Sequence, residues 1–577
     1  MKNKSKTNVG EKMAIFSPAL SEDELAQRTQ YLKFQQQEYE FTHEYVEGLS
    51  LFKEVPVQEG FSTAYLADRE FQLSAISINM LAVEPRPFLD PLETLGDYEN
   101  FYKIIRKPGV ANIYQTDRAF AEQRLSGVNP LVIKKFTEMP AGVDISLQDL
   151  GQETQVLFSS SATNLQAEIQ RGHIFVADYT ESLSFVEGGT YEKGRKYLPK
   201  PIAFFWWRKD GIKDRGELVP IAIAIELNTA DKKWKILIPR DKDLHWTAAK
   251  LCVQIADANH HEMSTHLGRT HLVMEPFAVS TARQLAKNHP LGLLLRQHFR
   301  FMIAINDMAR RELINPGGFV EAALAGTLPE SLRIVKNACV SWNIKDFAFP
   351  TELKNRGMDE KDDRDNYKLP HYPYRDDGLM LWNAIEDFVT GYLKIFYPKP
   401  EDIQSDRELQ QWAAELASAD GGKVAKMPEK ISDIEELIEI ITTIIFICGP
   451  QHSAVNFPQY EYIGFIPNMP LAAYQEITGA EDQFKEERDL LQLLPPLKQT
   501  ATQLLTMYNL STYHYDRLGY YDEEFENTVK GTDIEPIVAK FKQDLNQIEV
   551  EIDNKNKDRT IPYPFLKPSL VLNSICI

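Results

Sequence analysis

Three histidines recur at five-residue intervals in one apolar stretch of the chain, at positions 261, 266 and 271. On an α-helix, five residues turn a side chain through about 500°, so His266 and His271 would point about 140° apart. A local change to i→i+5 hydrogen bonding underwinds the helix and brings such a pair onto nearly the same face. The stretch from Trp246 to Phe277 is rich in alanine and aliphatic residues. The sequence therefore predicts a buried central helix with a π-bulge at the histidines.

Two other interpretations of this triplet compete with a shared metal site. A single histidine on a buried helix is more often an ordinary core residue bonded to a backbone carbonyl, but three at a fixed interval weigh against that interpretation. A zinc protease needs H-E-x-x-H, with two histidines at α-helical i,i+4 spacing. Here three residues separate His261-Glu262 from His266. The spacing excludes the protease motif.

Further ligands for a metal are available in QHSAVNFPQY, where His452 and Asn456 are four residues apart. Four residues turn an α-helix through about 400°, so both side chains can face one point without distortion. Imidazoles combined with an amide oxygen and a carboxylate suit non-haem iron better than structural zinc. The carboxylate could be that of the terminal residue, Ile577, which is ionised at neutral pH. The competing interpretation of this apolar end is a simple packed terminus.

These residues stand in segments that resemble the lipoxygenase family, over roughly residues 120 to 577. The segments are FAEQRLSGVNPLVI at 120–133, the histidine block with its WTAAK and EPF flanks, HPLGLLLRQHFRFMIAINDMARRELINPGG at 289–318, HYPYRDDGLMLWNAI at 371–385, QHSAVNFPQY at 451–460 and the terminal isoleucine. The resemblance implies one large, mainly α-helical catalytic domain around the central helix, with a small antiparallel β subregion. We expect this domain to span residues 56–577.

The resemblance also implies a ligand set for a single non-haem iron that alternates between Fe²⁺ and Fe³⁺. The ligands fall on His266, His271, His452, Asn456 and Ile577. His261 matches a position that is not a ligand. Manganese is compatible with the same ligand types but is less favoured. In the family the base is a hydroxide on the iron, so no side chain needs to act as one.

The implied activity is insertion of O2 into a polyunsaturated fatty acid with a cis,cis-1,4-pentadiene, such as linoleate or linolenate, to give a conjugated hydroperoxide. Two alternatives stay open. One is a relative that isomerises hydroperoxides to epoxyalcohols or allene oxides. The other is a non-catalytic lipid-binding protein of the same fold, which the loss of a ligand would signal. No ligand position is lost here.

Residues beside the ligands and in the substrate pocket follow from the same resemblance. Gln459 is expected to support Asn456, and Glu262 to occupy a position that relatives fill with Gln or Glu; the alternative for both is a solvated polar side chain. The pocket residues carried over are Ala309, whose methyl group would shield one end of the pentadiene, Leu313, which would clamp the substrate over the iron, and Ala258, Ala323 and Leu324, which would set pocket depth. Two alanines and a leucine at those positions predict a deep cavity.

Two positions differ from the usual family pattern. Met469 replaces an arginine found at the pocket base in plant enzymes, and Met308 replaces a basic residue found near the entrance in several animal enzymes. Because burial of an unpaired carboxylate is costly, we expect the acid to enter methyl end first with its head near water. Regiochemistry and stereochemistry are left open by the sequence.

Charge and cysteine usage limit the partners. The net charge of −19 and the pI near 5.2 argue against nucleic acid and provide no broad basic surface for anionic lipid. The four cysteines have no metal or disulfide spacing, so we expect a reducing, cytoplasmic location. The expected partners are a fatty acid and O2.

Residues 1–55 are expected to form an N-terminal extension, with a disordered start followed by an amphipathic helix. Leu25, Leu32, Tyr39 and Val46 recur every seven residues, which favours packing against the catalytic body; contact with a membrane or a partner helix is the alternative. The extension is too short and too helical for the β-sandwich that many lipoxygenases carry, so the chain resembles a minimal bacterial-type enzyme.

Two other regions have clear secondary-structure patterns. Between Lys200 and Asp241, three apolar runs, of which the first two are separated by turn residues, predict short antiparallel strands. From Ile431 to Cys448, an isoleucine-rich run interrupted by acids is too short to span a bilayer. It predicts a buried helix that leads to His452.

Overall fold

The computed structural model describes residues 22–83, 92–159, 161, 163–209, 216–227, 233–241 and 244–577. At its centre is a continuous helical run from residue 245 to residue 284. Helix α7 (His245–His260) passes into a π-helix, η4 (His261–His271), then into a short 3-10 turn, η5 (Leu272–Met274), and finally into α8 (Glu275–Gln284). Most of its side chains are buried. The predicted central helix and its π-bulge are confirmed.

A close helix contact keeps η4 in place. Gly268 packs against α12 (Leu328–Ser341), where a Cβ on the glycine would come within 3.0 Å of the Ala338 Cβ. Any larger residue would push the two helices apart. Within the π-helix, the Thr270 hydroxyl donates to the Thr265 carbonyl at 2.8 Å, which ties together residues five apart. The wide turn is therefore supported by its own side chains as well as by its neighbour.

The second central run extends from residue 434 to residue 462. It consists of α17 (Ile434–Phe446), a π-turn η6 (Ile447–Gln451), α18 (His452–Asn456) and α19 (Pro458–Tyr462). By length and composition this run could cross a membrane, but 94% of its most apolar window is buried inside the protein. The expected buried helix is present, although it continues well past Cys448. The sequence pattern ended there because Gly449 and Pro450 follow, and the π-turn accommodates the proline.

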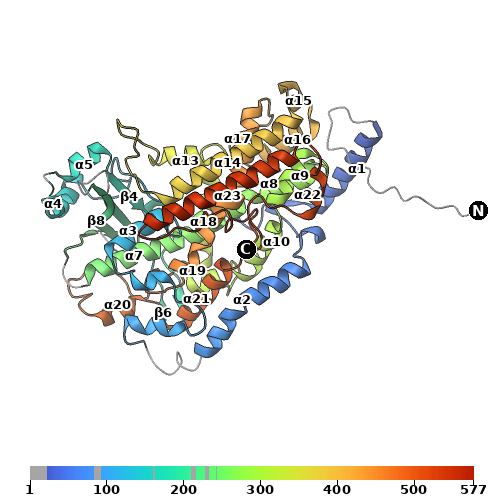
Figure 1. Ribbon diagram of the computed structural model, residues 1–577. Helices are drawn as coiled ribbons and strands as arrows, with labels where there is room; N and C mark the ends of the chain where they lie inside the picture. Colours follow the sequence, from blue (N-terminus) through green and yellow to red (C-terminus); the bar gives the residue numbers. More distant parts are fainter. Residues whose placement is uncertain are drawn as a thin grey trace, which may run out of the picture.

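Long helices surround these two runs (Figure 1). Helix α14 (Pro373–Phe396) packs against α17 and against α23 (Glu535–Asp558), while α2 (Thr63–Val83) packs against α21 (Leu497–Ser511) on the other side. The other α-helices are α3 (Asp117–Ser126), α4 (Leu147–Phe158), α5 (Leu165–Arg171), α6 (Thr180–Leu183), α9 (Pro290–His298), α10 (Met302–Glu312), α11 (Phe319–Ala323), α13 (Phe349–Asn355), α15 (Pro400–Ser405), α16 (Arg407–Ala417), α20 (Glu487–Leu493) and α22 (Glu523–Val529), with 3-10 turns η1 (Val57–Glu59), η2 (Leu95–Phe101) and η3 (Gly109–Asn112).

A small antiparallel sheet lies at one end of the molecule, with α4 and α5 beside it (Figure 1). Its strand order is β3-β4-β7-β8-β9. The strands are β3 (Lys134–Lys135), β4 (Ile174–Asp178), β7 (Pro201–Lys209), β8 (Gly216–Glu226) and β9 (Trp234–Leu237); β1 (Phe41–Thr42) pairs with β2 (Leu51–Phe52), and β5 (Thr190–Tyr191) with β6 (Gly194–Arg195). The three strands predicted between Lys200 and Asp241 are confirmed as β7, β8 and β9.

The N-terminal helix α1 (Glu22–Glu38) packs on α8. Its Arg28 pairs with Glu408 at 2.6 Å, and Leu32 is buried, whereas Leu25 is 45% exposed. Tyr39 and Val46 are buried beyond the end of the helix, because the chain turns into β1 after residue 40. Three of the four heptad residues are therefore buried, Leu25 is not, and the helix ends before Tyr39 and Val46. The domain boundary at residue 55 stays a prediction, and the expected disordered start lies outside the described residues.

The C-terminal segment runs into the core between the two central helical runs and α2. Asn573 anchors it: its Oδ1 accepts from the Gly519 amide, and its Nδ2 donates to Asp516 and to the Arg517 and Tyr520 carbonyls. Four residues later, Ile577 is only 2% exposed. The last residue is thus delivered to the interior by fixed polar contacts, and it packs in an apolar cluster with Tyr65.

Candidate metal centre and adjoining cavity

Three histidines from the two central runs converge on one point. One ring nitrogen from each of His266, His271 and His452 lies within 4.8 Å of the others. The Nε2 atoms of His266 and His271 are 3.1 Å apart. Two imidazoles that bind one ion at about 2.1 Å, with an angle near a right angle, place their nitrogens about 3 Å apart. The π-helix therefore sets the pair at the spacing of two ligands on a single ion.

The electrostatic environment keeps these rings neutral. Burial lowers the pKa of His266, and it lowers that of His271 to about 3, with the neighbouring His266 ring adding to the effect. The pKa of His452 is well below its usual value, first because of burial and then because of His271 and His266. A neutral imidazole keeps a lone pair for a metal. The cluster thus presents donors and no positive charge.

The His271 ring is oriented by a buried chain of polar groups. Its Nδ1 lies 2.9 Å from Oδ1 of Asn306 on α10, and Nδ2 of Asn306 donates to Glu275 at 3.0 Å. Glu275 in turn pairs with Arg310 at 3.1 Å. Such partners fix the tautomer of a ligand and its direction. Sequence reasoning missed Asn306 and Glu275; Asn306 follows the apolar start of α10, and Glu275 is the first residue of α8.

In the second helical run, His452 and Asn456 differ in their hydrogen bonding. Neither ring nitrogen of His452 has a hydrogen-bond partner, although the ring is fully buried. Asn456 is held on both sides of its amide, because Nδ2 donates to the Leu510 carbonyl at 2.8 Å and Oδ1 accepts from Gln459 Nε2 at 2.9 Å. The structure thus brings Gln459 to Asn456, as expected for a supporting residue.

The chain terminus reaches the same place. Ile577 lines one cavity together with His266 and His271, and its main chain lies beside the His452 ring, where it opposes the lowering of the pKa of that histidine. It makes no hydrogen bond of ordinary geometry with the ring. The preceding carbonyl, of Cys576, accepts from the Tyr65 hydroxyl at 2.5 Å. The terminal carboxylate is therefore close to the histidine cluster.

His261 and Glu262 lie at the edge of the cluster. His261 Nε2 is 2.8 Å from the Val455 carbonyl, and its ring stacks on that of His266. The Glu262 carboxylate lies 3.4 Å from His261 Nδ1 and 4.0 Å from His266 Nδ1. Burial favours the protonated acid, but the two histidines outweigh it and hold the pKa of Glu262 below its usual range. An ionised carboxylate therefore borders the cluster.

The residues present fit a bound metal cation. Buried polar atoms normally have partners, yet both nitrogens of His452 and one oxygen of Glu262 have none. A cation at the point shared by the three rings would use the free His452 nitrogen as a ligand. Imidazole, amide and carboxylate donors suit iron or manganese more than structural zinc.

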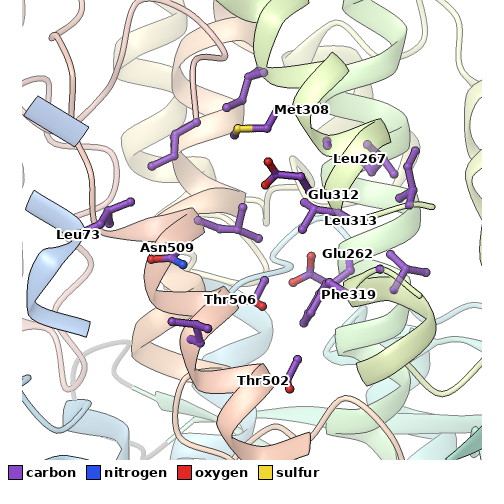
Figure 2. Close-up of a pocket in the computed structure, with 18 of the residues that line it drawn as sticks. Leu73, Glu262, Leu267, Met308, Glu312, Leu313, Phe319, Thr502, Thr506 and Asn509 are labelled. Carbon is purple, nitrogen blue, oxygen red and sulfur yellow. The ribbon is translucent and has the colours of Figure 1, made fainter. Parts of the chain in front are cut away.

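A cavity of about 1130 Å³ opens beside the cluster. Thr502, Thr506 and Asn509 of α21 face Leu313 and the neighbouring residues across it (Figure 2). The α10–α11 wall is mostly apolar, and consists of Ile305, Met308, Ala309, Leu313, Phe319 and Val320. Helix α2 closes the remaining side. An apolar chain can thus lie along α10 and α11 next to the metal centre.

The structure places only some of the expected pocket residues in this lining. Met308, Ala309 and Leu313 line the cavity. Among the described lining residues, Ala258, Ala323, Leu324 and Met469 do not appear. They are fully buried in the core instead, and the main chain after α11 is held there by Lys196, which donates to the Leu324 carbonyl at 2.5 Å. That these positions set the pocket depth stays a prediction.

Known proteins resemble this chain over most of its length. The lipoxygenase family model matches residues 100–563. An allene oxide synthase-lipoxygenase protein of Plexaura homomalla is 30% identical over 516 residues, which cover 84% of this chain and 46% of that protein. A linoleate 9/13-lipoxygenase of Pseudomonas aeruginosa is 31% identical over 494 residues, which cover 83% of this chain and 69% of the relative. The chain thus spans less than half of the first relative and about two thirds of the second.

Solved structures agree with these matches. A crystal structure of a LOX variant in complex with arachidonate has a TM-score of 0.86 and 27% sequence identity, and the match covers 97% of this chain and 82% of that one. The helical fold, the histidine cluster on a π-helix and the family match over residues 100–563 all point to the same family. This chain belongs to the lipoxygenase family.

Proposed function

We propose that the protein is a non-haem iron dioxygenase that inserts O2 into polyunsaturated fatty acids with a cis,cis-1,4-pentadiene and forms conjugated hydroperoxides. One observation carries the proposal: three buried, neutral imidazoles meet at one point, and two of them, His266 and His271, line a cavity of about 1130 Å³. The named activity of the Pseudomonas relative and the arachidonate in the solved LOX structure support the substrate class.

Iron would be held by the side chains of His266, His271, His452 and Asn456 and by the terminal carboxylate of Ile577. When bound, it would supply one-electron redox chemistry toward the substrate and O2. The chain contributes the position of these donors. Asn306 orients His271, Gln459 holds the Asn456 amide, and Tyr65 holds the last peptide. Each contact reduces the motion of a donor atom.

The cavity positions the pentadiene and keeps bulk water away from it. Leu313 and Ala309 are in the apolar wall beside the histidines, so an acyl chain that lies on them exposes one face of its pentadiene toward the metal centre. We propose that the Ala309 methyl group covers part of the other face and so limits where O2 adds. Positioning of reactants in this way accounts for a large part of enzymatic rate enhancement.

We further propose that the fatty acid enters methyl end first. Glu262 next to the histidines and Glu312 on α10 both line the cavity, but only Glu262 is buried, whereas Glu312 is exposed (Figure 2). A substrate carboxylate in the interior would meet the like charge of Glu262 in a region of low dielectric, which costs several kcal/mol. An apolar end meets no such penalty. The head group therefore stays at the open side of the cavity.

Oxygen uptake with linoleate by metal-assayed protein, followed by chiral chromatography of the product, tests this function. We expect iron in near-stoichiometric amount, oxygen consumption and one dominant conjugated hydroperoxide. If the iron-loaded protein consumes no oxygen with any pentadiene acid, the proposal fails. The same sample would then be given a fatty-acid hydroperoxide, because conversion without oxygen uptake would identify a hydroperoxide isomerase. A manganese-loaded sample assayed in parallel distinguishes the two metals.

A further inference from the structure

A second cavity, of about 520 Å³, lies where residues 45–55 meet the helical body. One of its walls comes from those residues, and the other comes from α10, α12 and Leu272, the neighbour of His271. Sites for small molecules commonly have volumes of about 300–1,000 Å³ and lie where two parts of a protein meet. The second cavity therefore has the size and the position of a ligand site.

Helix α10 separates this second cavity from the larger one beside the histidines, the substrate cavity. Met308 and Ala309 line the substrate cavity. The next two residues, Arg310 and Arg311, line the second cavity. A step of two residues turns a helix through about 200°, so the two pairs lie on opposite faces of α10. Ile314, shortly after the helix, lines both cavities. A ligand in the second cavity therefore contacts the reverse side of a wall of the substrate cavity.

Arg310 lacks one hydrogen-bond acceptor. Its side chain is only 8% exposed, and its Nη1 pairs with Glu275 at 3.1 Å. Its Nη2 is buried and has no hydrogen-bond partner. The Phe52 and Tyr45 rings lie over the guanidinium, with their centres 3.8 Å and 4.9 Å from its central carbon. A ring carries no oxygen that can accept from Nη2, although buried N–H groups normally have an acceptor. A ligand in the cavity that Arg310 lines can supply it.

The charged lining of the second cavity suits an anion. It consists of three basic and two acidic side chains, those of Lys53, Arg310, Arg311, Glu54 and Asp307. Arg311 pairs with Asp307 at 2.8 Å. Lys53 pairs with Glu40, outside the lining, at 2.7 Å. The described lining of the substrate cavity has the opposite balance, with three glutamates and one arginine. By its charged side chains, the second cavity is the more favourable of the two for a carboxylate.

The second cavity also has an apolar part, to which Val55, Leu272, Ile314 and Leu332 belong. We propose that this cavity is an effector site that binds a fatty acid, with the carboxylate at Arg310 and the acyl chain on the apolar residues, and that its occupation strengthens metal binding at the histidine cluster. A carboxylate forms strong, charge-assisted hydrogen bonds with a guanidinium. The bound fatty acid supplies the acceptor that Nη2 lacks.

Arg310 connects the effector site to the metal centre. Its partner Glu275 accepts from Asn306 Nδ2, and Asn306 Oδ1 lies 2.9 Å from Nδ1 of His271. A carboxylate on Nη2 holds the guanidinium at both ends and adds negative potential to this chain of hydrogen bonds. Asn306 Oδ1 then becomes a stronger acceptor, which makes the imidazole a stronger donor to a metal. This coupling rests on the proposed metal site, whereas binding of the fatty acid does not.

Calorimetric titration of the iron-loaded, full-length protein with laurate tests the site, because laurate has no pentadiene. We expect the wild type to bind a second laurate besides the one in the substrate cavity. Val55→Trp fills the effector site from one wall and Leu332→Trp from the other, so both variants should lose the second laurate. Val57→Trp is the matched control, since Val57 is 94% exposed and is not among the described lining residues of either cavity. A single laurate in the wild type, or a second one in both Val55→Trp and Leu332→Trp, overturns the proposal.

A competition titration of the metal-free protein with iron and a chelator, with and without laurate, tests the coupling. Laurate in the substrate cavity acts alike on wild type, Val57→Trp and Val55→Trp. We therefore expect laurate to raise the iron affinity about fivefold more in the first two than in Val55→Trp, which is the lower end of the usual coupling between two sites. An equal change in all three proteins would show that the second cavity is not an effector site. If the second laurate binds and raises the iron affinity but linoleate causes no oxygen uptake, the effector site stands and the proposed function fails.

Discussion

The two helical segments that supply the imidazoles are built alike and held differently. Both contain a π-turn, η4 before and through His271 and η6 just before His452. The His271 ring is tied by Asn306 to Glu275 and Arg310, so its direction is fixed by protein contacts alone. The His452 ring is equally buried, but neither of its nitrogens has a hydrogen-bond partner.

This difference indicates which part of the site is ordered without the ion and which part depends on it. On the η4 side, the His271 ring is held in place without an ion, since Asn306 bonds to its Nδ1. The η6 side depends on the ion, because a buried imidazole without a partner loses the hydrogen bonds it had with water. Removal of each histidine should therefore affect metal binding alike and stability differently.

The largest combined effect is expected for His271→Leu. The variant should lose the metal and all activity, and its metal-free form should also be less stable than metal-free wild type by about 1–3 kcal/mol, because Asn306 Oδ1 is left buried without its donor. Metal analysis and thermal unfolding of the chelated proteins measure both effects. His245→Leu, more than twenty residues earlier on the same helical run, is the control. If chelated His271→Leu were as stable as chelated wild type, the His271–Asn306 hydrogen bond would not contribute to the stability of the metal-free protein.

His452→Leu should abolish metal binding and activity as completely, with little cost to the metal-free fold. Leucine has a similar volume, and replacement of an unpaired polar ring by an apolar side chain is close to neutral. The same metal analysis and unfolding experiment applies. If His452→Leu retains the metal, His452 is not a ligand. If its chelated form is much less stable than chelated wild type, the His452 side does not differ from the His271 side in the way described.

The next largest effect is expected when one glycine is added after Ile577. The added residue moves the terminal carboxylate about 3.5 Å from its place, although Asn573 still holds the segment. We expect most of the activity to be lost and metal to dissociate more easily, while the unfolding temperature of the chelated protein changes little. Iron retention during dialysis against a chelator measures this. Full activity of the extended protein would show that the terminal carboxylate is not needed.

Asn306→Ala should have a smaller effect than loss of a ligand. His271 remains, but its ring loses the acceptor that fixes its direction. Loss of such a partner typically lowers metal affinity about tenfold to a hundredfold. A competition titration with a chelator measures the change, and Asn509→Ala, on the far wall of the cavity, is the control. If the metal affinity stays at the wild-type value, the hydrogen-bonded groups Asn306, Glu275 and Arg310 contribute to packing and do not orient His271.

Local sequence accounted well for elements whose cause is local. The five-residue spacing of His266 and His271 predicted the π-helix, because the turn angle per residue is a property of the helix itself. The apolar runs between Lys200 and Asp241 predicted β7, β8 and β9. The turn η6 was missed although it contains Pro450, because a helix usually stops before a proline and here buried packing on both sides carries it through.

Contacts between distant parts of the chain could not be predicted from local sequence patterns. Ala323 and Leu324 were expected in the pocket, but Lys196, more than a hundred residues earlier, holds the end of α11 in the core. Asn306 is inconspicuous in the sequence and becomes important only because α10 crosses the end of η4.

The sequence by itself determined the kinds of donor, their spacing within each helix and the apolar end that brings a carboxylate inward, because these depend on residue chemistry and on the geometry of one helix. Only the tertiary structure decided which side chains share a hydrogen bond, which buried atoms lack one and which walls enclose the cavity. These properties depend on packing between segments hundreds of residues apart, and each is the joint result of many weak contacts that no single segment encodes.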